Sequence, residues 1–252
     1  MLESVFNQTF TDFEVIIVND GSTDDTSEIL KRINHQKVKI IETENRGPAE
    51  ARNLAVEHAH SSIIMNLDAD DKIAPELLEN AYRIFSTNTN IGIVYCDAEC
   101  FGARSGKFEI GEYSIESMLI DNRITSLAFF RKDDWLAVGG YSGDLVYGLE
   151  DWDFWLSLIE TGREVVKIPE RLVFYRTYHR KNESRSGKRK GNRRKMMESM
   201  VIIFNRHKKL YSSFPKAFDH FSEIERKLKN ENFLVRIIKN SIYRFMQSHF
   251  WK

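Results

Sequence analysis

Short apolar runs of strand length alternate with helical patterns through the first half of the chain. These runs are nearly continuous, as in strands buried on both faces of a sheet: residues 15–18, 38–41, 63–67 and 91–95. Between them lie apolar residues at helical spacing, such as Leu77, Ala81 and Phe85. Repeated strand–helix–strand units predict an α/β fold, with a mostly parallel central sheet flanked by helices.

The second half of the chain is less regular. Its apolar runs predict further strands at residues 127–130, 165–168 and 172–175. A helix is predicted at residues 151–159, with Trp155 on its apolar face packed in the core. The polar, basic stretch at residues 180–195 lacks apolar periodicity and is typical of a loop.

Charge divides the chain into two parts. The 252 residues have a net charge of zero, but residues 1–175 contain 31 Asp+Glu against 16 Lys+Arg, a net charge of −15. Residues 176–252 contain 6 against 21, a net charge of +15. An acidic body suits a metal ion, and a basic tail suits a phosphate-rich surface. We therefore predict a first domain over residues 1–186 and a basic helical extension over residues 187–252.

Composition narrows the class of protein. A hydrophobic content of 42% supports a sizeable core. Cys96 and Cys100 are too few for a disulfide framework or a zinc site, so we expect packed thiols in a reducing compartment. No apolar run approaches the roughly 18 residues that a bilayer span needs, and the N-terminus lacks the pattern of a secretory signal. We expect a cytoplasmic protein.

The C-terminal tail combines an apolar helical stripe at residues 233–250 with basic residues beside it. Such a segment favours an anionic membrane surface, so we expect peripheral contact with the cytoplasmic face of a membrane. The same stripe is also suited to packing on the acidic body or to forming a homodimer. The tail carries no recognisable nucleic-acid-binding motif, and we do not expect nucleic acid as a partner.

Residues 66–71 place three carboxylates on a turn directly after an apolar run. Asp68 and Asp70 form an Asp-x-Asp pair, and Asp71 follows. Clustered carboxylates repel one another unless a cation neutralises them, and oxygen ligands favour Mg²⁺ or Mn²⁺. An acidic turn of this kind also occurs as a solvated helix cap, so the turn alone does not decide between the two.

Other polar residues follow strands or begin helices. Asp20 ends a strand, where it can accept a hydrogen bond from a base or ribose or cap the next helix. Arg52 lies early in a helix, as a nucleotide contact or as a solvated charge. Glu150 and Asp151 begin a helix whose dipole favours acidic residues. Asp151 can also act as a general base, with Trp152 as a stacking surface for a sugar.

In their order and spacing these segments resemble family 2 of the glycosyltransferases, which have the A-type fold of nucleotide-diphospho-sugar transferases. The resemblance covers roughly residues 2–186. It rests on the motifs ESVFNQTFTDFEVIIVNDGSTD, NRGPAEARN, NLDADD, VGGY and LEDWD. It implies a metal-dependent, inverting hexosyltransferase that takes a nucleotide-sugar donor, expected to be a UDP-sugar. The implied acceptor is a saccharide or a lipid-linked saccharide, in cell-surface polysaccharide synthesis.

The resemblance also implies roles for donor-side residues. Asp20 matches the aspartate that contacts the nucleotide base, and Arg52 matches an arginine near the nucleotide. Asp68 lies towards ribose or metal, and Asp70 matches the direct ligand of a divalent metal, Mg²⁺ or Mn²⁺. His179 resembles a downstream histidine that helps to bind the metal or the diphosphate.

On the acceptor side, Asp151 matches the catalytic base of the family's Glu-Asp motif, with Glu150 beside it and Trp152 as the acceptor contact. The Gln-x-x-Arg-Trp motif of processive members is absent from the sequence. The resemblance therefore implies that one sugar is added at a time.

The N-terminus departs from the family pattern. Residues 1–5 already match the helix that follows the family's first strand, so we expect a central strand and part of the nucleotide pocket to be missing. This leaves open an inactive homologue that only binds nucleotide. A basic nucleic-acid-binding module is a second alternative. A metal-dependent phosphohydrolase is a third, but the sequence lacks a suitably placed nucleophilic aspartate near its start.

Overall fold

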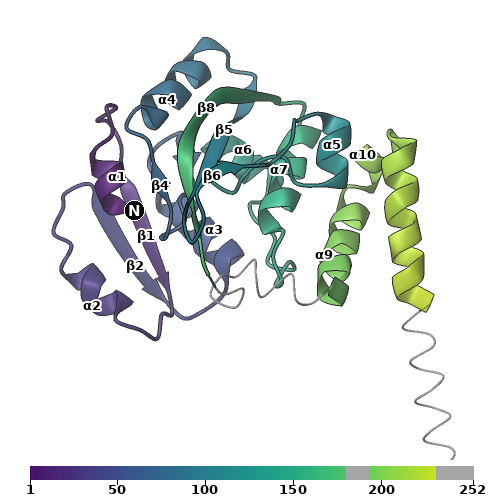
Figure 1. Ribbon diagram of the computed structural model, residues 1–252, viewed down its shortest axis with the longest axis horizontal. Coiled ribbons are helices and arrows are strands. Elements are labelled where there is room, and N and C mark those ends of the chain that lie inside the picture. Colours follow the sequence, from purple (N-terminus) through teal and green to yellow (C-terminus); the bar gives the residue numbers. More distant parts are fainter. Residues whose placement is uncertain (180–192, 231–252) are drawn as a thin grey trace, which may run out of the picture. The chain divides into compact units, whose positions relative to one another are not determined.

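The computed structural model of the protein describes residues 1–179 and 193–230 (Figure 1). The chain divides into two compact units, residues 1–191 and 192–252. The predicted boundary after residue 186 falls among residues 180–192, outside the described part. Each unit is described by itself.

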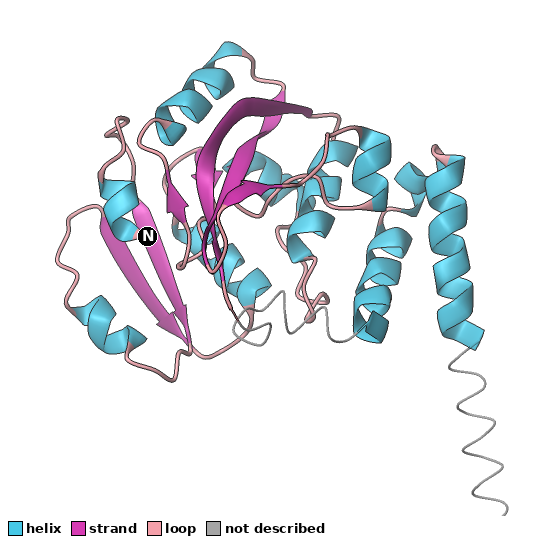
Figure 2. Ribbon diagram, in the orientation of Figure 1, coloured by secondary structure: helices cyan, strands magenta, loops and turns pink. Residues whose placement is uncertain are grey.

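The first unit contains two β-sheets with helices packed on them (Figure 2). In the smaller sheet, β1 (Val15–Asp20) pairs in parallel with β2 (Val38–Thr43). The larger sheet has the strand order β3 (Ile63–Met65), β7 (Phe129–Arg131), β5 (Ile91–Gly102), β8 (Glu164–Thr177) and β4 (Lys72–Ile73), with β6 (Gly106–Phe108) paired to β5. The helices of the first unit are α1 (Leu2–Phe6), α2 (Thr26–Lys31), α3 (Pro48–His58), α4 (Leu77–Thr87), α5 (Ile115–Ile120), α6 (Lys132–Val138) and α7 (Glu150–Glu160).

The predicted α/β class, a central sheet flanked by helices, is confirmed, but the strand pairing is more mixed than the mostly parallel sheet that we expected. β5 and β8 pair in parallel, as β1 and β2 do. β7 runs antiparallel to both of its neighbours, β3 and β5. β4 pairs antiparallel with β8, and β6 pairs antiparallel with β5. Apolar periodicity identifies strands but not their neighbours, which is why the pattern missed this.

The two strands predicted at residues 165–168 and 172–175 are parts of one long strand, β8. Cys96 of β5 pairs with Ile168, whereas Asp97 pairs with Arg171, so the register skips Pro169 and Glu170. Proline cannot donate a backbone hydrogen bond to the ladder, and a bulge accommodates it. Because β8 continues beyond the bulge, it reaches the acidic turn with its C-terminal end.

The core of the first unit has two halves, on opposite faces of the larger sheet. One half joins alternate residues of β5 to helix α4: Val94, Cys96, Ala98, Leu77, Ala81 and Phe85. In the other half, Phe130 of β7 contacts Phe154 and Trp155 of α7. Trp155 is fully buried and both cysteines are buried and free, as predicted. These packing contacts hold the larger sheet in place, and the candidate site lies at the ends of its strands.

The second unit is helical, as predicted for the basic extension. It contains α9 (Arg193–Arg206), α10 (Lys208–Ser212) and a helix over residues 215–230. Phe204, Tyr211 and Phe221 pack edge to face or stacked on one another. The stripe at residues 233–250 lies outside the described residues. Within residues 1–179 and 193–230, every helix is too short or too polar to cross a membrane.

Candidate active site

The acidic turn connects the end of β3 to the start of β4. The amide of Asp71 donates to the carbonyl of Asp68 over 3.1 Å, which closes the turn. Asp70 is exposed and the Asp68 carboxylate is 40% exposed. The Asp-x-Asp pair therefore faces solvent at the end of a strand, where ligands of α/β sheets bind.

The third carboxylate of the turn, Asp71, points inward instead. Its residue is 1% exposed, and Oδ1 accepts a hydrogen bond of 2.7 Å from the amide of Arg176 in β8. Oδ2 has no hydrogen-bond partner among the described residues. Burial raises the pKa of Asp71 to about 7, and the charges of Asp70 and Asp68 act in the same direction. Asp71 ties the turn to β8.

Arg52 of α3 lies between two carboxylates that are far apart in the sequence. Its Nη1 donates to Glu150 Oε1 over 2.8 Å, and its Nη2 donates to Asp68 Oδ1 over 3.2 Å. The side chains of Arg52 and Glu150 are 15% and 5% exposed. Burial alone would lower the pKa of Arg52, but the two carboxylates outweigh it and hold the pKa above its usual value. This bridge joins the acidic turn to the start of α7.

Asp151 occupies the first turn of α7, next to Glu150. Asp151 Oδ2 accepts a hydrogen bond of 3.0 Å from Nδ2 of Asn122. The residue before the helix, Leu149, has a φ of 75° and is the non-glycine residue with positive φ in residues 1–179 and 193–230. Such strained backbone is frequent beside functional groups. The Asp151 carboxylate therefore lies at the N-terminus of α7, where the helix dipole favours its negative charge.

Trp152 is not available as a stacking surface, which corrects its assignment as an acceptor contact. The residue is 1% exposed, and its indole Nε1 donates to the carbonyl of Met118 over 2.7 Å. A buried indole with a satisfied N–H is a core residue. Helical periodicity placed Trp152 on α7 correctly but could not tell which face the rest of the fold covers.

Asp20 ends β1 and holds the loop that leads into α3. Its two carboxylate oxygens accept hydrogen bonds from the amides of Arg46 and Gly47, over 2.7 and 2.9 Å. Gly21 follows with a φ of 67°, and a Cβ there would lie 2.6 Å from the amide nitrogen of Asn45. Asp20 thus shapes the sheet edge, and its contact with a nucleotide base stays a prediction.

Two of the motifs that sequence analysis treated separately lock together. Asn53 Nδ2 donates to the carbonyl of Tyr141, and Asn53 Oδ1 accepts from the Tyr141 amide, both over 2.8 Å. Asn66, next to the acidic turn, donates to the Tyr141 hydroxyl. Sequence analysis missed these positioning roles, and Asn122 with them, because no local pattern reports partners that are 29 to 88 residues away.

The role of His179 beside the Asp-x-Asp pair stays a prediction. The residue is exposed, and residues 1–179 and 193–230 contain no group of three His, Cys, Asp or Glu side chains that could hold a metal ion. The neighbouring residue Tyr178 contacts Asp70, with its hydroxyl 2.7 Å from Oδ2. The described residues therefore offer two solvent-facing carboxylates, a hard-oxygen set that fits Mg²⁺ or Mn²⁺ if further oxygen ligands complete the coordination.

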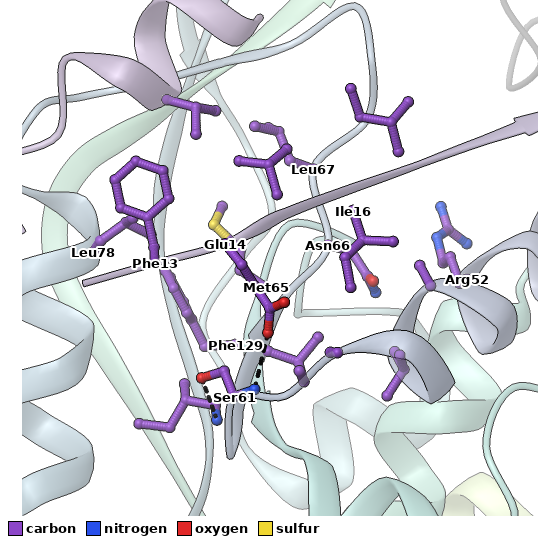
Figure 3. Close-up of a pocket in the computed structure, with 18 of the residues that line it drawn as sticks. Phe13, Glu14, Ile16, Arg52, Ser61, Met65, Asn66, Leu67, Leu78 and Phe129 are labelled. Carbon is purple, nitrogen blue, oxygen red and sulfur yellow. Dashed lines mark hydrogen bonds between the residues drawn. The ribbon is translucent and has the colours of Figure 1, made fainter. Parts of the chain in front are cut away.

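A cavity of about 630 Å³ lies between β1 and β3 and reaches the site at one end (Figure 3). Its wall is apolar at Ile16, Met65 and Phe129, and Arg52 and Asn66 line its polar end. In the described part of the chain β1 pairs with β2 alone and β3 with β7 alone, so the strand edges at the cavity are unpaired. A strand placed here would join the two sheets. The expected absence of a central strand stays a prediction.

The family model and the similar proteins all point to the same family of enzymes. Residues 1–136 match Glycosyl transferase family 2. An uncharacterized glycosyltransferase of Haemophilus influenzae is 34% identical over 194 residues, which is 73% of this chain and 65% of that protein. Chondroitin synthase of Escherichia coli is 30% identical over 189 residues, 73% of this chain and 27% of the synthase. The chain thus spans less than two thirds of these relatives.

Solved structures share the fold. TarS 1–349 of Staphylococcus aureus in complex with UDP-GlcNAc has a TM-score of 0.66 at 16% identity, over 89% of this chain and 67% of TarS 1–349. The mannosyltransferase PcManGT of Pyrobaculum calidifontis in complex with GDP-Man and Mn²⁺ has a TM-score of 0.64 at 18% identity, over 98% and 77%. The predicted A-type glycosyltransferase fold is confirmed.

Proposed function

The chain belongs to glycosyl transferase family 2, and on that premise we propose that it transfers a single sugar from a nucleotide-diphosphate sugar to a saccharide or lipid-linked acceptor. The donor in this proposal is a UDP-sugar, and the product is part of a cell-surface polysaccharide. The similarity to chondroitin synthase supports the polysaccharide product. The nucleotide sugars bound by proteins of the same fold support the class of donor.

One observation carries the proposal: Arg52 bridges Asp68 and Glu150. This contact brings the acidic turn, the proposed donor side, within one side chain's length of the start of α7, the proposed acceptor side. An inverting transferase needs its leaving-group site and its base close together, on opposite faces of the reacting carbon. In this proposal Arg52 and Glu150 orient the donor side and the acceptor side relative to each other. Asp20 lies on the side of the nucleotide.

Asp151 is the proposed base. Its carboxylate takes the proton of the acceptor hydroxyl while that oxygen attacks the anomeric carbon from the face opposite the leaving group. The bond from the anomeric carbon to the diphosphate oxygen breaks, and the nucleoside diphosphate leaves with the electron pair. A single displacement of this kind inverts the anomeric configuration, with an oxocarbenium-like transition state as in glycoside hydrolysis.

Asp68 and Asp70 are the residues proposed to hold a divalent ion, Mg²⁺ or Mn²⁺, together with the donor diphosphate. The exposure of both carboxylates supports this assignment, and the Mn²⁺ in the complex of the similar mannosyltransferase is consistent with it. When bound, such an ion offsets the negative charge that grows on the diphosphate leaving group. His179 stays a predicted third ligand.

The metal assignment predicts that nucleotide and ion bind together. Isothermal titration of the chain with UDP is expected to give an affinity at least about 10-fold higher in Mn²⁺ than in chelator, because the two carboxylates repel the diphosphate without a cation. Asp70→Asn should lower the UDP affinity measured in Mn²⁺ to the UDP affinity measured in chelator. Equal UDP affinities in Mn²⁺ and in chelator would remove the metal from the proposal.

The proposal extends to location. We propose that the protein is cytoplasmic and binds the cytoplasmic face of a membrane through its basic C-terminal residues, whose net charge over residues 176–252 is +15. Basic residues near an anionic surface contribute about 1 kcal/mol each. The acceptor, if lipid-linked, is presented at that surface.

Sedimentation with lipid vesicles tests this location. The chain is expected to sediment with anionic vesicles but not with neutral ones, and added salt should weaken the binding because it screens surface charge. Deletion of residues 231–252 should reduce binding to the anionic vesicles. If sedimentation is unchanged by the deletion, the stripe at residues 233–250 serves intramolecular packing or a homodimer instead.

A further inference from the structure

The C-terminal end of β8 and Tyr178, the residue after it, donate three hydrogen bonds to the acidic turn. The Tyr178 hydroxyl donates to Asp70 Oδ2 over 2.7 Å, and Arg176 Nε donates to the Asp70 carbonyl over 2.8 Å. The Arg176 amide donates to Asp71 Oδ1 over 2.7 Å. Two of these contacts hold the backbone and the buried side chain of the turn. The contact from Tyr178 is different, because it reaches the solvent-facing carboxylate itself.

Tyr178 is placed by this polar contact rather than by burial. The residue is 38% exposed, whereas Arg176 before it lies over the ring of Phe101 at 4.5 Å and anchors the strand end. A phenol hydroxyl is a hydrogen-bond donor as well as an acceptor, whereas an ionised carboxylate only accepts. Tyr178 is therefore the donor in this contact.

We propose that Tyr178 is a positioning residue that orients the Asp70 carboxylate for a divalent cation, with its hydroxyl taking Oδ2 so that Oδ1 is the oxygen presented to the ion. Among the described residues no side chain or amide hydrogen-bonds to Oδ1. The inference rests on the proposed function, in which Asp70 is a metal ligand.

The physical basis is the cost of ordering a surface carboxylate. An exposed aspartate rotates freely, and a ligand that must be ordered on binding loses affinity in proportion to the conformations it gives up. Hydrogen bonds to ligating carboxylates supply that order in advance, and their removal typically lowers metal affinity by about 10–100-fold. Phenylalanine at position 178 keeps the ring and removes only the donor, so it isolates this effect.

The test compares Tyr178→Phe with Tyr82→Phe. Tyr82 of α4 is 50% exposed, and its ring packs against Phe10. UDP binding is measured by titration calorimetry in Mn²⁺ and in chelator, and Mn²⁺ binding without nucleotide by electron paramagnetic resonance. Tyr178→Phe is expected to weaken both Mn²⁺ binding and UDP binding in Mn²⁺ by about 10-fold. UDP binding in chelator should be unchanged, and Tyr82→Phe should match the native protein throughout.

A merely structural contact gives a different result. If Tyr178→Phe weakens UDP binding equally in Mn²⁺ and in chelator, or leaves Mn²⁺ binding unchanged, the positioning role is overturned. If the native protein itself binds UDP with the same affinity in both conditions, the metal assignment of the proposed function fails, and the role of Tyr178 fails with it. The native control therefore separates the two failures.

Discussion

Asp151→Asn is expected to lower sugar transfer by about 10²–10⁴-fold, the range that general base catalysis contributes. The amide cannot take the proton of the acceptor hydroxyl. It has nearly the same shape as the carboxylate and can still accept the hydrogen bond from Asn122. Donor affinity should therefore stay within about twofold of the native value, since the change removes an interaction made only in the transition state. Steady-state kinetics and donor titration measure the two quantities.

A matched control is available for this substitution. Asp133 is an exposed aspartate in the first turn of α6, as Asp151 is in the first turn of α7. Asp133→Asn should leave transfer unchanged, which would show that loss of a helix N-terminal charge is not the cause. Near-native transfer by Asp151→Asn would assign the base to another residue.

Arg52→Met is expected to destabilise the first unit by about 3–5 kcal/mol, the cost of leaving a buried charge without its partner. Methionine keeps much of the length of the side chain but removes both hydrogen bonds. Glu150, whose side chain is 5% exposed, then keeps a negative charge in the core. Urea unfolding followed by tryptophan fluorescence measures the loss, since Trp135, Trp152 and Trp155 all lie in this unit.

Two further variants show whether burial is the reason. In the double variant Arg52→Met, Glu150→Gln the charge of the glutamate is also gone, so part of the lost stability should return. Arg83→Met breaks an exposed pair with Glu79, whose side chains are 69% and 47% exposed, and should change stability by less than about 1 kcal/mol. If Arg52→Met and Arg83→Met have equal effects, Arg52 is a surface charge and not the link between donor and acceptor sides.

Much of the fold follows from local pattern. The runs at residues 15–18, 38–41 and 91–95 lie in strands, and the apolar stripe of α4 is buried against β5. These elements are predictable because backbone periodicity and burial on a face are properties of consecutive residues. The antiparallel course of β7 and the continuity of β8 through Pro169 are not, since both depend on which strands become neighbours.

The candidate site shows the same division. The Asp-x-Asp turn and the acidic start of α7 are visible in the sequence because a strand end or a helix start sets each one locally. The bridge from Arg52 to Glu150 spans 98 positions, and the contact from Tyr178 to Asp70 spans 108. Only the fold brings such residues together. For this reason sequence analysis could not identify Tyr178, next to the predicted ligand His179, and it took the buried Trp152 for an exposed residue.

The central claim is that the acidic turn and Asp151 act together on a nucleotide sugar. The most direct test incubates the chain with a panel of UDP- and GDP-sugars and with saccharide or lipid-linked acceptors, and measures the nucleoside diphosphate released. We predict that at least one donor gives Mn²⁺-dependent release, and that Asp70→Asn and Asp151→Asn each abolish it. Release that is equal in the native protein and both variants, or no release above the Asp151→Asn background with any donor, would contradict the claim.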